Sequence, residues 1–142
     1  MISTARQAAI ACLSFIAILL LASCGGPKGP ETLAANLTDT SIQVSATTLP
    51  AGTINFHIAN ASTSELHEFV IIRTDLNADQ LPVAADGNVD EEKLSSPGEK
   101  GDIAAGQVGD LTLALPAGRY MFICNQPGHF KAGMHTVFNV TS

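Results

Sequence analysis

A thiol, an imidazole and a thioether lie within eleven residues near the C-terminal end of the chain. Cys124, His129 and Met134 are separated by four residues each, and Pro127 and two glycines mark the segment between them as a loop. A second imidazole, His67, lies 57 residues before the cysteine. Two imidazoles and a thiolate, with a thioether as a weak fourth ligand, form the donor set of a blue copper site. These four side chains are therefore the candidate metal ligands.

Other uses of these side chains fit the sequence less well. A zinc site prefers four strong donors, and a thioether is a poor ligand for zinc. Calcium and magnesium prefer oxygen ligands. A nucleophile pair of Cys124 and His129 would leave Met134 unexplained. One cysteine in the loop and the absence of a His-x-His pattern leave no ligands for a second copper centre. We therefore expect a protein that is not an enzyme.

Three further donor side chains are expected to lie outside this site. Met121 precedes Cys124 by three residues on a predicted strand, so it points to the opposite face. His57 lies on the polar side of its strand, which predicts a solvated side chain. His135 directly follows Met134 and faces the other way.

Alternating apolar and polar residues predict strands through most of the chain. Two further runs, Leu66–Ile72 and Arg119–Cys124, are apolar on both faces, which is typical of central strands in a stack of two sheets. Turn signals rich in Pro, Gly and Asn separate these segments. The alternating segments are 42–46, 53–58, 111–115 and 134–141.

One long polar segment, Asp75–Asp102, interrupts this pattern and contains eight acidic residues. Asn88 followed by Glu91 is a capping pattern, and it predicts a short helix over Val89–Ser95. Short strands separated by turns indicate an all-β protein. We expect an antiparallel Greek-key β-sandwich or barrel with one long acidic loop that holds the short helix.

The N-terminal segment is predicted to be an export signal. A short apolar run ends in Leu21-Ala22-Ser23-Cys24, which resembles a bacterial lipobox, so residues 1–23 are interpreted as a lipoprotein signal peptide. Cys24 would carry the lipid, residues 24–31 would form a flexible tether, and residues 32–142 would form the domain. The alternatives are a plain signal peptide cleaved nearby and an uncleaved anchor.

Composition narrows the class of protein further. The 142 residues are 46% hydrophobic and 14% charged, which excludes a disordered chain. The net charge of −6 would repel a phosphate backbone, so we expect no binding of nucleic acid. With Cys24 lipidated, Cys124 is an unpaired thiol in an exported protein, where oxidation threatens it. A metal ligand is a role that explains such a thiol.

The two ligand segments resemble those of the cupredoxins, the family that includes plastocyanin, azurin, auracyanin and sulfocyanin. The resemblance is strongest over Asn60–Phe69, which contains the first histidine, and over Tyr120–Met134, which contains the motif Cys-x4-His-x4-Met. It extends over about Leu33–Thr141. Two features depart from the common pattern. Glu68 stands where many cupredoxins have Asn, and a carboxylate donates no hydrogen bond unless it is protonated. The loop length also matches neither plastocyanin nor azurin.

The resemblance implies both a cofactor and a function. By position, His67, Cys124 and His129 would be equatorial ligands of one type 1 copper ion and Met134 its axial ligand. A monomeric protein of this family would shuttle single electrons between redox partners, such as a cytochrome or a membrane complex. The lipobox would hold it at an extracytoplasmic membrane surface, in the bacterial periplasm or on the cell surface. A copper carrier without an electron-transfer role is the alternative, and a structural module with a vacant site is a third possibility.

Overall fold

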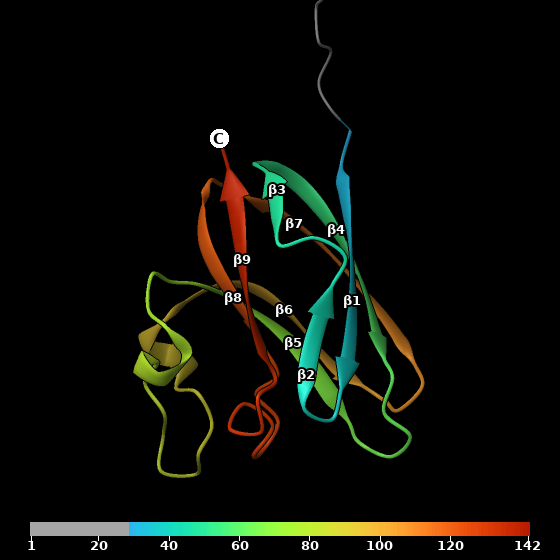
Figure 1. Cartoon of the computed structure of the whole chain (residues 1–142), viewed down its shortest axis with the longest axis vertical. Helices are drawn as coiled ribbons and strands as arrows, with labels where there is room; N and C mark the ends of the chain where they lie inside the picture. The colour runs from blue at the N-terminus through green and yellow to red at the C-terminus, as the bar shows by residue number, and fades with distance from the viewer. Residues whose placement is uncertain (1–28) are drawn as a thin grey trace, which may run out of the picture.

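The computed structural model describes residues 29–142, which form two β-sheets packed face to face (Figure 1). The predicted signal peptide (1–23), the predicted lipidation site Cys24 and most of the predicted tether lie outside the described residues. No helix formed by the described residues is long and apolar enough to span a membrane. The strands are β1 (Glu31–Thr38), β2 (Ser41–Val44), β3 (Thr48–Pro50), β4 (Gly52–Asn60), β5 (His67–Arg73), β6 (Ser95–Ile103), β7 (Val108–Leu115), β8 (Gly118–Ile123) and β9 (His135–Thr141).

The prediction of an all-β sandwich is confirmed, and the sheets are mixed rather than purely antiparallel. One sheet has the strand order β2-β1-β4-β7 and the other β3-β9-β8-β5-β6. β1 pairs with β4 in parallel, and β3 pairs with β9 in parallel. The reason is the path of the chain, which leaves the first sheet after β2, joins the second as β3 and turns back as β4. β4 therefore runs beside β1 in the same direction.

The periodic segments form strands as predicted. β4 and β7 cover two of the segments that alternate in sequence, and inward positions such as Ile54, Phe56 and Ile58 are buried. β2 ends two residues before the predicted segment 42–46 does, and β9 begins one residue after the start of 134–141. The two runs that are apolar on both faces become β5 and β8, which are neighbours inside the five-stranded sheet. Strands covered on both faces have this composition, because neither face meets water.

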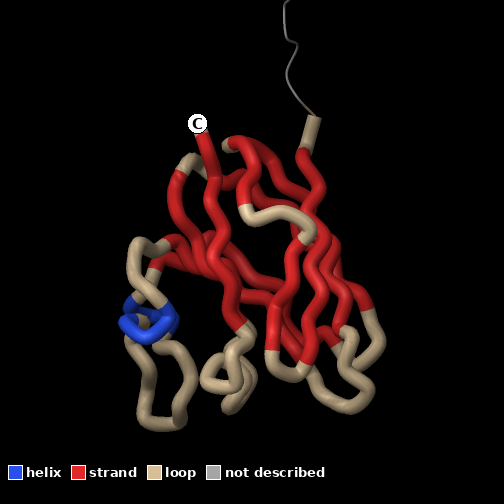
Figure 2. The backbone as a smooth tube through the Cα atoms, viewed as in Figure 1, coloured by secondary structure: helices blue, strands red, loops and turns tan. Residues whose placement is uncertain are grey.

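The acidic segment is more ordered than the sequence suggested. Its last part is β6, an edge strand that pairs with β5, so the prediction of one continuous loop is wrong there. The sequence of β6 does not predict a strand, because it is polar and mostly exposed and contains a proline. Pro97 is tolerated there because β6 is an edge strand. The predicted helix shortens to a single 3-10 turn, Glu91–Lys93, with Asp90 rather than Asn88 at its start. A second 3-10 turn covers Ala78–Gln80 (blue in Figure 2).

The main core lies between the sheets and is centred on four aromatic rings. Phe122 contacts Phe56, Phe69 and Phe138, with ring centroids 5.8, 4.8 and 4.9 Å away. All four side chains are buried. Tilted, edge and stacked ring pairs add to the free energy that burial of their area already contributes. This aromatic cluster joins strands of both sheets.

A second, smaller core covers the outer face of β5 and β8. The segment between β5 and β6, residues 74–94, folds over this face and is called the β5–β6 connection below (Figure 1). Its Leu81 and Val89 pack with Met121, which confirms that Met121 points away from the face of Cys124. The other members of this core are Val70, Ile72, Ile123 and Phe130.

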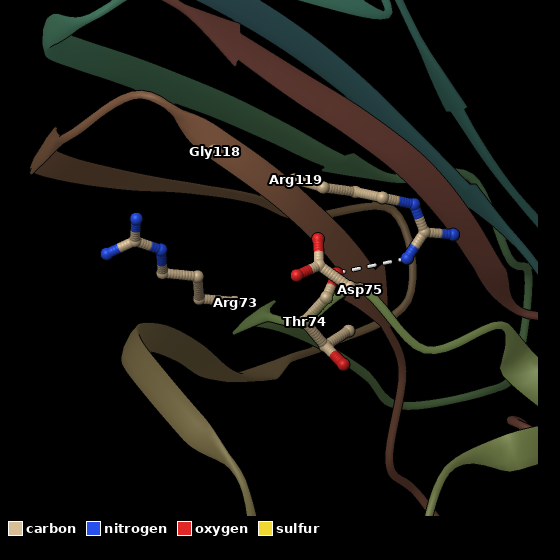
Figure 3. Close-up of a pocket in the computed structure, with 5 residues that line it drawn as sticks. All are labelled: Arg73, Thr74, Asp75, Gly118 and Arg119. Atoms are coloured by element: carbon tan, nitrogen blue, oxygen red, sulfur yellow. Dashed lines mark hydrogen bonds between the residues drawn. The ribbon is translucent and has the colours of Figure 1, made fainter.

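A pocket lies at the far end of β5, where the β5–β6 connection begins. Arg73, Thr74, Asp75, Gly118 and Arg119 line it (Figure 3). The Arg119 guanidinium donates to the carbonyl oxygens of Thr74 and Leu76, at 3.0 and 2.6 Å. These hydrogen bonds fasten the start of the connection to β8.

Four strand ends meet at the opposite end of the sandwich. β1 and β8 end there, and β5 and β9 begin there (Figures 1 and 2). His67 is the first residue of β5, Cys124 follows β8 and Met134 precedes β9. The topology therefore brings candidate ligands from distant parts of the sequence to one end.

Phe122→Ala tests whether the aromatic cluster stabilises the sandwich. Removal of a buried phenylalanine ring typically costs about 3–5 kcal/mol of unfolding free energy. We expect a loss of this size in denaturant unfolding of the metal-free protein. Val108→Ala, at a half-exposed position of β7, is the control and should change the free energy by about 0.5 kcal/mol or less. Equal losses in the two variants would contradict the assignment.

Candidate metal centre

Three of the four predicted ligands meet at the end of the sandwich. The Cys124 Sγ atom lies 3.8 Å from Nδ1 of His67 and 3.4 Å from Nδ1 of His129. The two Nδ1 atoms are 3.1 Å apart. All three atoms lie within 4.8 Å of one another, and no other group of His, Cys, Asp and Glu in residues 29–142 converges in this way. A single metal ion fits between donors this close.

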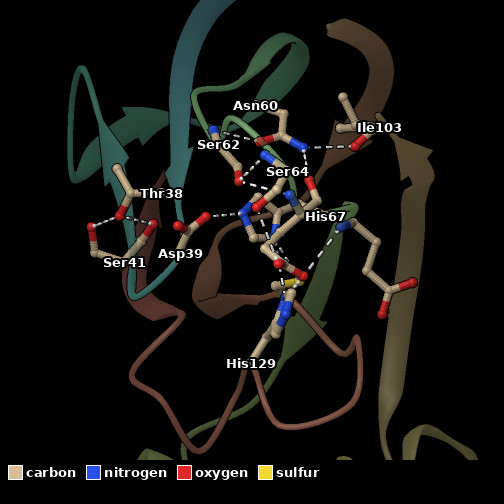
Figure 4. Close-up of polar contacts among 12 residues, drawn as sticks. Thr38, Asp39, Ser41, Asn60, Ser62, Ser64, His67, Ile103 and His129 are labelled. Carbon is tan, nitrogen blue, oxygen red and sulfur yellow. Dashed lines mark hydrogen bonds and ion pairs between the residues drawn. The ribbon is translucent and has the colours of Figure 1, made fainter. Parts of the chain in front are cut away.

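The histidine of β5 is held by the loop that precedes it. The amide of Asn60 donates to the carbonyl oxygens of Glu65 and Ile103, at 2.9 and 2.8 Å, and its Oδ1 accepts from the Ser62 N–H (Figure 4). Asn60 and Ser62 are buried, so these hydrogen bonds are shielded from water. They fix the direction in which the chain enters β5 at His67.

The loop that carries the other ligands is a series of tight turns. The His129 N–H donates to the Gln126 carbonyl oxygen, and the His129 carbonyl oxygen accepts from the Met134 N–H. Gly133 has a φ of +108°, and a Cβ there would lie 3.1 Å from the carbonyl oxygen of Thr40. Only glycine adopts such a backbone without strain, so the sequence closes the loop against the β1–β2 turn.

Met134 is placed beside the cysteine by the backbone. Its carbonyl oxygen accepts a hydrogen bond of 3.0 Å from the Cys124 N–H. Both side chains are fully buried and belong to the same core cluster. The thioether is therefore in the dry region next to the thiol, as a weak fourth donor would be.

Burial decides the protonation of the two innermost donors. Burial lowers the pKa of the His67 imidazole, repulsion by His129 lowers it further, and the Asp39 carboxylate opposes both effects. The imidazole is therefore held neutral, with a lone pair free for a metal. Burial also raises the pKa of the Cys124 thiol, against the backbone N–H groups of Glu68 and Gln126. A bound cation must displace this proton, so binding is coupled to proton release.

The other donor side chains lie elsewhere. His57 is on the outer face of β4, where its Nδ1 lies 2.8 Å from the exposed carboxylate of Asp110. His135 packs its ring against Phe130 at a centroid distance of 5.3 Å. Neither belongs to the group that converges around Cys124.

Glu68 uses both its backbone and its side chain at this site. Its N–H lies 3.5 Å from the Cys124 sulfur, and its carboxylate accepts a hydrogen bond from the Asn125 N–H. Burial raises the pKa of this carboxyl, and the nearby carboxylates of Glu91 and Glu99 raise it further. The carboxylate thus links the two ligand segments by accepting a hydrogen bond. This contact does not need the N–H donor that an asparagine at position 68 would offer.

Asn125 connects the ligand loop to the β5–β6 connection, which the sequence did not suggest. Its Oδ1 accepts from the Val89 N–H at 2.7 Å. Its Nδ2 donates to the Val89 carbonyl oxygen at 2.9 Å and to Glu91 at 2.7 Å. Phe130, from the middle of the loop, is buried in the second core with Val89. The acidic segment therefore supports the loop through packing and hydrogen bonds.

Comparison with known proteins identifies the family. The profile of the sulfocyanin (SoxE) domain matches residues 14–142, which is most of the chain. The chain belongs to the sulfocyanin domain family. No curated protein sequence matches the chain significantly.

Solved structures agree with this sulfocyanin fold. Auracyanin from Roseiflexus castenholzii is 21% identical over 82% of this chain and 100% of its own, with a TM-score of 0.58. Auracyanin A from Chloroflexus aurantiacus, a "blue" copper protein, is 23% identical over 80% and 100%, with a TM-score of 0.58. Rusticyanin from Thiobacillus ferrooxidans is 19% identical over 80% and 79%, also at 0.58. At these identities the similarity supports the fold alone.

Sulfocyanins are cupredoxins, so the prediction of the cupredoxin family is confirmed. Cupredoxins bind copper and transfer electrons. The donors in this sulfocyanin domain fit that cofactor, because one thiol and two imidazole nitrogens converge in a buried place with a thioether beside them. The cofactor that the family and this donor set support is a single type 1 copper ion.

Glu68→Gln tests the cost of the buried carboxylate. The raised pKa means that folding favours the protonated form, so its contribution to stability is complete below the ordinary value and is lost as the pH rises through the raised value. Glutamine mimics the neutral acid, and its Oε1 still accepts from the Asn125 N–H. We therefore expect a higher Tm of the metal-free variant than of the parent at pH 7, and a smaller difference at pH 4. Glu92→Gln, at an exposed carboxylate, controls for net charge; an equal gain at both pH values would contradict the interpretation.

Proposed function

We propose that this protein is a mononuclear type 1 copper protein that passes single electrons between redox partners. His67, Cys124 and His129 would be the equatorial ligands and Met134 the axial one. The observation that carries the proposal is the convergence of one thiol and two imidazole nitrogens within 4.8 Å, at the buried end of a β-sandwich. When bound, copper supplies one-electron chemistry between its Cu(I) and Cu(II) states.

The chain's part in this function is to hold the donors in one arrangement. Hydrogen bonds of Asn60 hold the segment before His67, and hydrogen bonds of Asn125 hold the loop after Cys124. They limit how far a donor can move when the charge at the site changes. A site that rearranges little loses or gains an electron at a small reorganisation cost. The apolar side chains around Cys124 and Met134 exclude water and so influence the reduction potential.

His129 is the proposed route for electrons to the surface. His67, Cys124 and Met134 have no exposed surface, whereas His129 is partly exposed on its loop. Its neighbours Pro127 and Gly128 are exposed and uncharged, so they offer a partner an uncharged approach to the ring on that side. A small, transient contact of this kind suits an electron carrier.

The alternative of a copper carrier is less well supported. A carrier hands over its metal by exchange of ligands, which requires that an incoming donor reaches the site. Three of the four proposed ligands are fully buried. Asn125 and Phe130 also attach the ligand loop to the β5–β6 connection, which opposes the movement that such an exchange requires.

The positions of the two ends of the sandwich are compatible with the proposed location and partners. The chain enters the fold at the start of β1, at the end opposite to the metal centre (Figure 1). A lipid on Cys24 would therefore leave this centre facing away from the membrane surface, where a monomer could meet a cytochrome or a membrane complex. The exposed carboxylates of Asp39 and Glu65 beside the centre would attract a positively charged partner.

Cys124→Ser is the decisive test of the ligand assignment. A thiolate bound to Cu(II) produces an intense visible absorption by charge transfer, which a hydroxyl does not reproduce. We expect the copper-loaded variant to lose this absorption while circular dichroism shows an unchanged β fold. An absorption that persists in the variant would refute the proposal.

Met134→Gln tests the axial assignment. An amide oxygen is a harder donor than a thioether and favours Cu(II). We expect the variant to retain copper and to have a lower reduction potential, measured by voltammetry. Met121→Gln, in the second core, is the matched control. An unchanged potential in Met134→Gln would show that Met134 is not a ligand.

A further inference from the structure

The imidazole of His67 has one nitrogen that the metal centre does not use. Its Nδ1 faces Cys124 and His129, so Nε2 lies on the other side of the ring. Nε2 is buried and has no hydrogen-bond partner among the described residues. If Nδ1 binds a metal, the neutral ring carries its proton on Nε2. A buried N–H without an acceptor is costly, so this atom requires a partner.

The carboxylate of Asp39 is in the position to be that partner. Its Oδ1 lies 3.5 Å from Nε2, at ion-pair distance but without the alignment of a hydrogen bond (Figure 4). Asp39 lies on the β1–β2 turn, which Thr38 and Ser41 close through their hydroxyl groups at 2.7 Å. The ligand loop packs against the same turn at Gly133. A small rearrangement of this turn or of the His67 ring would align the two groups for a hydrogen bond.

We infer that Asp39 is a positioning residue of the metal centre, which orients His67 by accepting a hydrogen bond from its Nε2–H group and places a negative charge behind that ligand. The inference rests on the proposed function. Histidine ligands of metals almost always donate their second N–H to an acceptor, and a carboxylate is the strongest one. Here the acceptor comes from a turn that contributes no ligand.

Two consequences follow from such a contact. The hydrogen bond selects the tautomer that leaves the Nδ1 lone pair free, so it favours binding of copper in either oxidation state. The negative charge favours Cu(II) over Cu(I), because attraction grows with the charge of the ion. The first effect needs only an acceptor, whereas the second needs the charge, and the two are separable by mutation.

Glu65 provides a matched control for the charge. Its carboxylate is exposed two residues before His67, and it also attracts a charge on this ring. However, its Oε1 accepts from the Ser64 hydroxyl at 3.2 Å. Glu65→Gln therefore removes one nearby negative charge and leaves the contact between Asp39 and Nε2 intact.

The experiment compares Asp39→Ala, Asp39→Asn and Glu65→Gln in the full chain. Copper affinity is measured by competition with a chelator, the potential by voltammetry, and the site by visible and EPR spectra. We expect Asp39→Ala to weaken Cu(II) binding by about 10–100-fold. Each tenfold loss of Cu(II) affinity relative to Cu(I) raises the potential by about 59 mV. Asp39→Asn retains an acceptor, so it should recover most of the affinity and keep the raised potential.

The possible outcomes separate the two proposals. A parent protein that binds copper, with Asp39→Asn and Asp39→Ala indistinguishable from Glu65→Gln, overturns the inference and leaves the proposed function standing. A parent protein that binds no copper overturns both. Asp39→Asn is nearly isosteric, so it decides the question of charge even if Asp39→Ala fails to fold.

Discussion

The metal centre depends on holding three polar donors together at one end of the sandwich, two of them fully buried and the third, His129, partly exposed. The thiol of Cys124 and the imidazole of His67 are fully buried, and burial opposes the charged form of each. Without a metal, no bound ion holds these groups together. The surrounding framework must therefore fix them by other means, and the two cores and the backbone hydrogen bonds provide it.

That framework supports the ligand loop from two sides. On one side Gly133 brings the loop against the β1–β2 turn, and on the other Asn125 and Phe130 attach it to the β5–β6 connection. β5 and β8 are adjacent strands whose pairing ends at Val70 and Ile123, so the sheet brings His67 and Cys124 close together. An arrangement defined by strand pairing and loop packing can persist when the charge of the site changes, which an electron carrier requires.

Two acidic residues next to the centre, Glu68 and Asp39, contact its donors without being candidate ligands. Glu68 accepts a hydrogen bond from the ligand loop through its buried side chain, and its backbone N–H faces the sulfur. Asp39 faces the other histidine nitrogen from a turn that lies far from the ligands in sequence. Such groups adjust the affinity and potential of a metal site without binding the ion.

The convergence of Cys124, His67 and His129 was predictable, because a metal restricts the residue types it accepts, and Met134 stays a predicted ligand. Most of the strands were predictable, because a half-buried strand alternates with a period of two. β6 was not, because an exposed edge strand needs no alternation, and neither was the parallel pairing of β1 with β4, which depends on the path of the chain between sheets. The neighbours of the ligands, Asp39 and Asn125, carry no local signal either. Their roles arise from contacts across long sequence separations, and packing in three dimensions alone determines those contacts.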